Sequence, residues 1–153
     1  MKRIYLFTIS CFFFLPSAMA AEWSADQLSL WQFVEQSWVD DADATGKWPE
    51  EYVHDGVQTW DSAWPTPRGK SSMSKWTSFR DSRSEMLQYE LFPHSLVVEG
   101  NTGVAFYSVV EVRRNAEGEV ERNVTGIVET AVRVRNSWKY LGLASFDKDT
   151  DSD

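Results

Sequence analysis

The sequence predicts an α+β fold in which a curved antiparallel sheet wraps around a long N-terminal helix. Residues 24–44 repeat apolar side chains at helical spacing, with Leu28, Trp31 and Trp38 on one stripe. From Glu85 onward the apolar spacing changes to alternation, which is typical of strands. A sheet that curls around a helix encloses space, so the sequence also predicts a cavity.

The N-terminal half is expected to be mainly helical. Ser24 followed by Gln27 makes a capping-box start, and Gly46 is expected to end the first helix. The other elements predicted in this half are a short helix at 48–53, a short strand at 56–60, a proline-containing loop at 64–69 and a helix at 71–83.

The C-terminal half is predicted to be a meander of long strands. Pro93 interrupts the first of them and requires an edge position or a bulge. Gly118 fits the left-handed position of a bulged turn, and Asn136 with Ser137 fits a two-residue turn. The predicted strands span residues 86–99, 104–112, 120–134 and 138–146.

The turn lengths predict which side chains share a face of this sheet. One face is almost wholly aliphatic and consists of Val104, Phe106, Val110, Val112, Val124, Val128, Val132, Leu141 and Leu143. The other is mixed and aromatic, and carries Tyr107, Val109, Glu111, Thr125, Ile127, Glu129, Arg133, Trp138, Tyr140 and Phe146. We expect the aliphatic face to lie against the helices and the mixed face to be covered by a second subunit, which gives a homodimer.

Residues 1–20 have the pattern of a secretory signal peptide. Lys2 and Arg3 precede an apolar run that is too short to span a bilayer, and residues 18–20 form an Ala-x-Ala cleavage site. We therefore expect an exported protein, periplasmic or secreted, with a mature domain at 21–147 and an acidic, disordered tail at 148–153.

Composition excludes several classes of function for the mature chain. The only cysteine, Cys11, lies in the signal, so no disulfide or cysteine-based site is expected. The full chain has a formal charge of −8, and removing Lys2 and Arg3 with the signal leaves −10, which disfavours nucleic acid as a partner. No second apolar stretch of membrane-spanning length follows, so no membrane contact is expected after signal removal.

Two segments carry a resemblance to a known family. Residues 57–61 (VQTWD) precede Pro67-Arg68-Gly69 and a helix, and residues 129–134 (ETAVRV) lead into 138–141 (WKYL). Over residues 28–146 the chain resembles the nuclear transport factor 2-like superfamily, most closely its SnoaL-like branch. The resemblance implies a cone-shaped α+β barrel with a cavity beside the first helix and, usually, a homodimer through the sheet. Members include ketosteroid isomerases, polyketide cyclases, dehydratases, epoxide hydrolases and binding or assembly domains, so it implies no single function.

The resemblance also assigns positions to the isomerase residues. It places the general base at Asp61 and the second acid at Thr130. The tyrosine that isomerases carry on the first helix has no counterpart, since nearby positions are Trp31, Glu35 and Trp38. Without the pair that stabilises the oxyanion, isomerase activity is not expected.

Asp61 is the leading candidate for a functional residue. It stands between Trp60 and Trp64, whose indoles would desolvate the carboxylate and let it act as a base or hold a polar ligand group. The alternative is a loop aspartate that caps a turn. Trp76 and Trp48 extend an aromatic rim that suits a flat apolar ligand or a cation, although tryptophans also fill cores.

The remaining candidates are weaker. Further ligand contacts are expected from Trp31, His94, Ser108 and Thr130. The two histidines, His54 and His94, are far apart, so no metal is expected. The sequence has no P-loop or dinucleotide-binding fingerprint, and no organic cofactor is expected. Glu111 and Glu129 are assigned to the outward face and to salt bridges at a dimer seam.

Three functions follow from these observations. The leading hypothesis is an exported protein that binds a small, largely apolar molecule in an aromatic-rimmed pocket. The alternative is a cofactor-independent enzyme of the proton-transfer type (a dehydratase, isomerase, cyclase or epoxide hydrolase) with Asp61 as the base. The third is a dimerising interaction module with no ligand.

Overall fold

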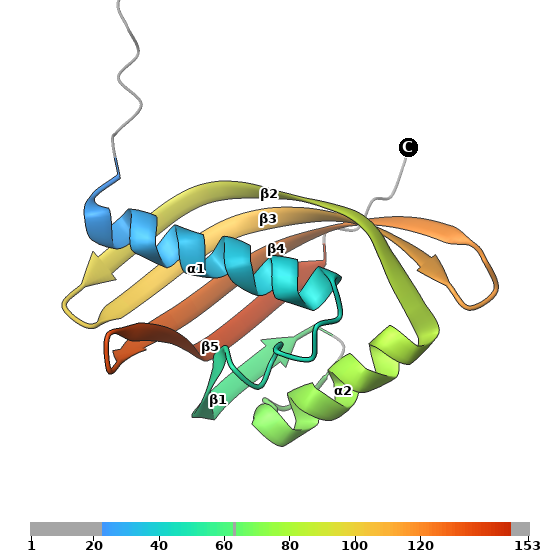
Figure 1. The fold of residues 1–153 in the computed structure, drawn as a ribbon, viewed down its shortest axis with the longest axis horizontal. Helices are drawn as coiled ribbons and strands as arrows, with labels where there is room; N and C mark the ends of the chain where they lie inside the picture. Colours follow the sequence, from blue (N-terminus) through green and yellow to red (C-terminus); the bar gives the residue numbers. More distant parts are fainter. Residues whose placement is uncertain (1–22, 63, 148–153) are drawn as a thin grey trace, which may run out of the picture.

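The computed structural model describes residues 23–62 and 64–147, and the fold is an α+β domain with one curved sheet (Figure 1). The predicted signal peptide and acidic tail lie outside the described residues. The elements in chain order are α1 (Ala25–Ala42), β1 (Val53–Asp61), α2 (Lys70–Arg83), β2 (Ser84–Glu99), β3 (Thr102–Asn115), β4 (Val120–Val134) and β5 (Ser137–Asp147).

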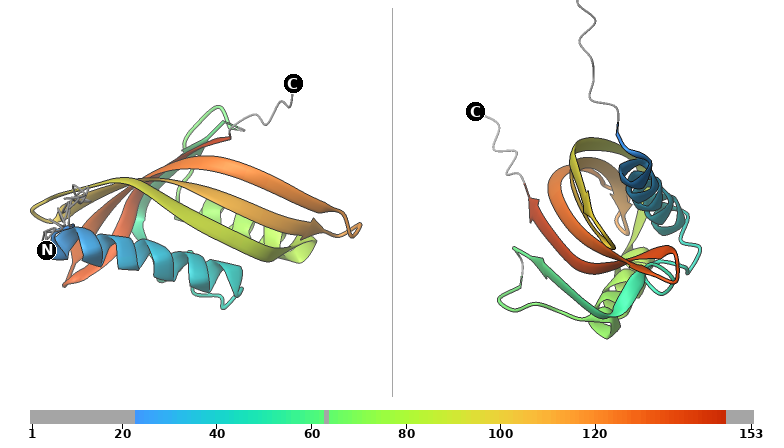
Figure 2. Two further views of the ribbon diagram at one scale, coloured as in Figure 1. Left: turned by 90° about the horizontal axis from the view of Figure 1, so that it is seen from above. Right: turned by 90° about the vertical axis from the view of Figure 1, so that its left-hand side faces the viewer.

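The sheet has the strand order β1-β5-β4-β3-β2. Strands β2 to β5 form the predicted antiparallel meander, whereas β1 runs parallel to β5. The sheet curls so that α1 lies across its concave side, while α2 closes the space near β1 (Figure 2). The predicted fold class is confirmed, with a sheet that is mixed rather than wholly antiparallel.

Helix α1 forms where the sequence predicts it. Ser24 and Gln27 make both hydrogen bonds of the capping box. Leu30 and Val34 are completely buried against the sheet. A Cβ added to Gly103 would lie 2.8 Å from Leu30 Cδ2, so glycine is needed where the helix approaches β3.

Two local predictions were wrong. Residues 48–52 form hydrogen-bonded turns rather than a second helix, because β1 begins at Val53 and leaves too few residues for one. The turn between β4 and β5 is centred on Arg135 and Asn136, both with positive φ, one residue earlier than predicted. By contrast, the register shift at Pro93/Ser95 and the positive φ of Gly118 are as expected.

The predicted orientation of the sheet faces was also wrong. The concave face, against α1, carries the aromatic and charged set, including buried Tyr107, Glu129 and Tyr140. The valine-rich face is convex, and Phe106 on it is 39% exposed. The reason is packing: concave positions 103, 105 and 131 are Gly, Ala and Ala, and only small residues let a helix lie this close. A register shift at Thr130/Ala131 further alters the facing pattern of β5.

Within the described part of the chain, neither helix has the length and apolar character that crossing a membrane requires.

Candidate functional site

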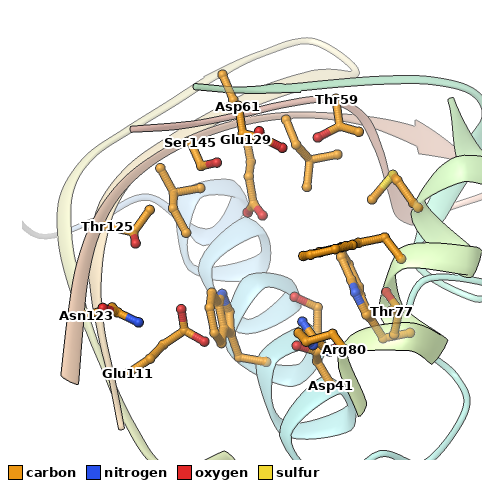
Figure 3. A pocket seen from close by; sticks show the side chains of 18 of the residues that line it. Asp41, Thr59, Asp61, Thr77, Arg80, Glu111, Asn123, Thr125, Glu129 and Ser145 are labelled. Atoms are coloured by element: carbon orange, nitrogen blue, oxygen red, sulfur yellow. Dashed lines mark hydrogen bonds and ion pairs between the residues drawn. The ribbon is translucent and has the colours of Figure 1, made fainter. Parts of the chain in front are cut away.

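A cavity of about 510 Å³ lies between α1, α2 and the concave side of the sheet (Figure 3). Its walls come from both helices, from strands β1, β3, β4 and β5, and from two connecting segments, which the fold brings together. The lining includes Trp38 and Asp41 of α1, Trp48 in the turn before β1, Thr59 and Asp61 of β1, Arg68 in the loop before α2, Trp76 and Arg80 of α2, Glu111 and Arg113 of β3, Glu129 of β4, and Leu143 and Ser145 of β5.

Three indoles contribute to the apolar part of the wall. Trp38 reaches down from α1 and donates a hydrogen bond from Nε1 to the Tyr107 hydroxyl at 2.9 Å. The ring of Trp48 lies edge-on to Tyr140, with centroids 5.8 Å apart. Trp76 on α2 is about half exposed and forms part of the rim. Indoles therefore line the cavity from α1, from the turn before β1 and from α2.

Each arginine of the lining already holds a carboxylate. Arg68 Nη2 lies 2.5 Å from Asp61, Arg80 Nη2 lies 2.5 Å from Asp41, and Arg113 pairs with Glu111 at 3.0 Å. All six side chains are less than a quarter exposed. These pairs fix the charged groups in place and leave little uncompensated positive charge in the cavity.

Glu129 is the most unusual residue of the site. It is only 4% exposed, and its carboxyl points into the cavity (Figure 3). Burial raises its pKa to about 7, while hydrogen bonds from the hydroxyls of Tyr140 and Tyr107 lower the pKa by less. Its Oε2 has no hydrogen-bond partner among residues 23–62 and 64–147. A carboxyl with this pKa can hold a ligand donor or exchange a proton near neutral pH.

Three of the residues predicted for the site line this cavity, namely Asp61, Trp76 and Trp48. Asp61 ends β1 at the cavity wall, where Arg68 rather than the neighbouring indoles is its charged partner. Trp76 lines the opposite side from α2.

The other indoles beside Asp61 lie outside the lining. Trp60 donates from Nε1 to the Trp64 carbonyl at 2.9 Å, which closes the loop after β1. Both rings are largely exposed, and the guanidinium of Arg68 lies 4.4 Å from the centroid of the Trp64 ring. These two residues therefore order the loop that presents Arg68.

The remaining predicted contacts are also elsewhere. Trp31 is in the core, edge-on to Tyr107 at 5.7 Å. His94 sits in the bulge of β2 and shares a 2.8 Å hydrogen bond with Ser108. Thr130 faces the convex side, one residue from Glu129. The structure brings none of these four into the cavity lining.

The sequence prediction missed Glu129 because it placed the wrong face of the sheet against the helices. Its assignment with Glu111 to an outward, interfacial face was wrong, since both line the cavity. One signal in the sequence could have found it. Gly103, Ala105 and Ala131 share its face, and a run of small residues marks the side on which a helix packs closely.

Within the described residues, no group of three or more His, Cys, Asp or Glu side chains is arranged to hold a metal ion.

Comparison with known proteins identifies the fold. No family model and no curated protein matches the sequence. Solved structures do match: a ketosteroid isomerase-like protein from Erwinia carotovora atroseptica has a TM-score of 0.72 at 9% identity, covering 82% of this chain and 98% of that one. An NTF2-like protein with a cystatin-like fold from Novosphingobium aromaticivorans has a TM-score of 0.64 at 13% identity, covering 83% and 84%.

A third similar structure is a putative Ca/calmodulin-dependent kinase II association domain from Exiguobacterium sibiricum, with a TM-score of 0.67 at 10% identity, covering 85% of this chain and 98% of that one. The chain thus has the nuclear transport factor 2-like fold, as the sequence predicted. None of these names specifies the SnoaL-like branch, which stays a prediction.

Proposed function

We propose that this protein binds a small organic molecule in the cavity between α1, α2 and the sheet. The observation that carries the proposal is Glu129, a desolvated carboxyl with an unpartnered oxygen that points into an aromatic-walled space. Leaving a buried acceptor unpaired costs about 1–3 kcal/mol, a cost that a ligand donor would remove.

The size and lining of the cavity support the same proposal. Its volume of about 510 Å³ falls within the range typical of sites for small molecules. The lining combines indoles with several carboxyls and arginines, so we propose a more polar ligand than the sequence predicted. Export through the segment at 1–20 remains part of the proposal and would place the ligand outside the cytoplasm.

The proposal predicts that the protein carries a small molecule when purified from the compartment in which it works. Native mass spectrometry of the mature chain is expected to show a non-covalent adduct of a few hundred daltons, the size that such cavities hold. Ser145→Phe places a ring in the cavity and is expected to abolish the adduct, because Ser145 points into that space (Figure 3). Ser137→Phe, on the exposed start of the same strand, is the matched control and should keep it. Equal amounts of adduct on the two variants would contradict the proposed location of the binding site.

A second candidate is an enzyme of the proton-transfer type. It is favoured by the pKa of Glu129, which suits a group that gives and takes protons near neutral pH. Asp61, the base expected from the sequence, is held by Arg68 at 2.5 Å. For an enzyme, Asp61→Asn or Glu129→Gln would abolish turnover of the co-purified compound, whereas for a binding protein each would change affinity only.

We further propose that the convex face of the sheet forms a homodimer. It exposes Phe106, Leu141 and Phe146, large apolar side chains that a second copy would cover. The prediction is that sedimentation velocity at micromolar concentration gives twice the chain mass, and that Phe106→Glu gives the monomer. Phe79→Glu, at an exposed position on α2, should leave the dimer intact. A wild-type monomer would refute this interface.

A further inference from the structure

Two buried side-chain nitrogen or oxygen atoms of the described residues lack any hydrogen-bond partner, and both belong to residues that line the same cavity. They are Oε2 of Glu129, which accepts, and Nε of Arg68, which donates. Native proteins leave few such atoms unpaired, because each costs about 1–3 kcal/mol. Their joint presence in one cavity indicates a ligand that satisfies both.

The strand register places the two residues at opposite ends of one row. Glu129 faces Leu143 across β4 and β5, Leu143 faces Thr59 across β5 and β1, and Thr59 pairs with Arg68. All four residues line the cavity. Neighbouring strands are about 4.8 Å apart, so three steps separate the two backbones by roughly 14 Å along the curved sheet. The side chains of Glu129 and Arg68 do not hydrogen-bond to each other, and Leu143 supplies an apolar surface between them.

The charges differ at the two ends of the row. At one end, Arg68 is already neutralised by Asp61, so its free Nε–H suits an uncharged acceptor such as a carbonyl oxygen. At the other end, Glu129 makes no salt bridge with any residue that the structure describes. The other lining arginines, Arg80 and Arg113, are occupied by Asp41 and Glu111. Any positive partner of the Glu129 carboxylate would therefore have to come from the ligand.

The surroundings of Glu129 suit an organic cation. Its neighbours Tyr107 and Tyr140 each contact an indole of the wall, Trp38 and Trp48 respectively. Indole faces attract cations as well as apolar groups, and the attraction is strongest where water is excluded. A protonated amine at this end would pair with the carboxylate and lie beside the aromatic wall.

Resting on the proposed binding function, we propose that the ligand is a bipolar organic amine. Its ammonium group binds Glu129 Oε2, its other end presents an uncharged acceptor to Arg68 Nε, and its apolar middle lies over Leu143. Glu129 has a pKa of about 7, and a bound ammonium group favours its carboxylate form. Binding of the ammonium group would therefore release the proton of Glu129 to solvent.

The test uses three matched probes and the full mature chain at slightly alkaline pH. 4-(Aminomethyl)benzamide carries both an amine and a carbonyl, benzylamine lacks the carbonyl, and benzamide lacks the amine. Isothermal titration calorimetry is expected to show that the bifunctional probe binds about tenfold more tightly than either other probe. Glu129→Gln should weaken the two amines about tenfold and leave benzamide unchanged. Arg68→Lys, which keeps a charge for Asp61 but removes Nε, should reduce the bifunctional probe to the affinity of benzylamine.

The controls separate this inference from the proposed function. Glu85→Gln removes a carboxylate that is exposed and outside the cavity, and should change no affinity. If benzamide binds as tightly as the amines, or if Glu129→Gln has no effect, the inference is wrong while a binding site still stands. If no probe binds but the native adduct is present, the ligand class is wrong. If neither probe nor adduct is found, the proposed function fails as well.

Discussion

Glu129→Gln is expected to remove most of the pH dependence of the free energy of unfolding between about pH 5 and pH 8.5. In the folded protein, burial raises the pKa of Glu129 to about 7, whereas an unfolded glutamate titrates near about 4.3. At a pH between these two pKa values, Glu129 is protonated in the folded state and ionised in the unfolded state. The stabilisation is therefore complete below the unfolded pKa and is lost as the pH rises through about 7.

For the wild type, the free energy of unfolding is expected to fall by about 3 kcal/mol from pH 5 to pH 8.5, since each pKa unit corresponds to about 1.4 kcal/mol. Urea denaturation followed by tryptophan fluorescence measures it at both pH values. Glutamine keeps the shape of the side chain and cannot ionise, so the variant should be more stable than the wild type at the higher pH. Glu85→Gln, at an exposed position, should keep the wild-type profile. A wild type that is equally stable at both pH values would show that Glu129 is not desolvated.

Leu30→Ala is expected to destabilise the fold by about 3 kcal/mol, within the range of about 2–5 kcal/mol for a buried leucine. Leu30 is fully buried on α1, and the absence of a Cβ at Gly103 leaves room for it on β3. Truncation would leave a void between helix and sheet that a rigid strand cannot close. The midpoint of urea denaturation at constant m-value reports the change.

Leu28→Ala is the matched control on the same helix. Leu28 is 46% exposed, so its truncation should cost well under about 1 kcal/mol. Similar losses for both variants would mean that α1 does not pack on the concave face as the structure has it.

Local features of the chain predicted most of the fold. The capping box of Ser24 and Gln27, the bulge at Pro93 and the left-handed Gly118 each depend on neighbours in sequence, and each is present as expected. The segment at 48–53 is different, because a proline near a possible first turn is compatible with a helix or a turn. Its outcome was decided by the start of β1 at Val53.

The candidate site could be predicted only in part, because it depends on which face of the sheet is concave. Alternation groups Tyr107, Glu129 and Tyr140 on one face, and this grouping was correct. Beyond the register shift of β5 the grouping was wrong, since Leu143 pairs with Glu129 on the concave face and Phe146 pairs with Gly126 on the convex face. Hydrophobicity then favoured burying the valines, whereas close packing of α1 requires the small residues at Gly103 and Ala105. The choice between the faces is a matter of shape between distant segments, which periodicity along one strand does not encode. Asp61 was located correctly at the end of β1, but its pairing with Arg68 arises from the loop after it.

The bulge of β2 also bears on solubility. As the outermost strand, β2 pairs with another strand along one side only, so over its 16 residues the other side could template further strands from other copies. Pro93 lacks an N–H, and the extra residue beside it bends the strand, so the template is broken near its middle. The bulge thereby protects this edge of the sheet from edge-to-edge aggregation.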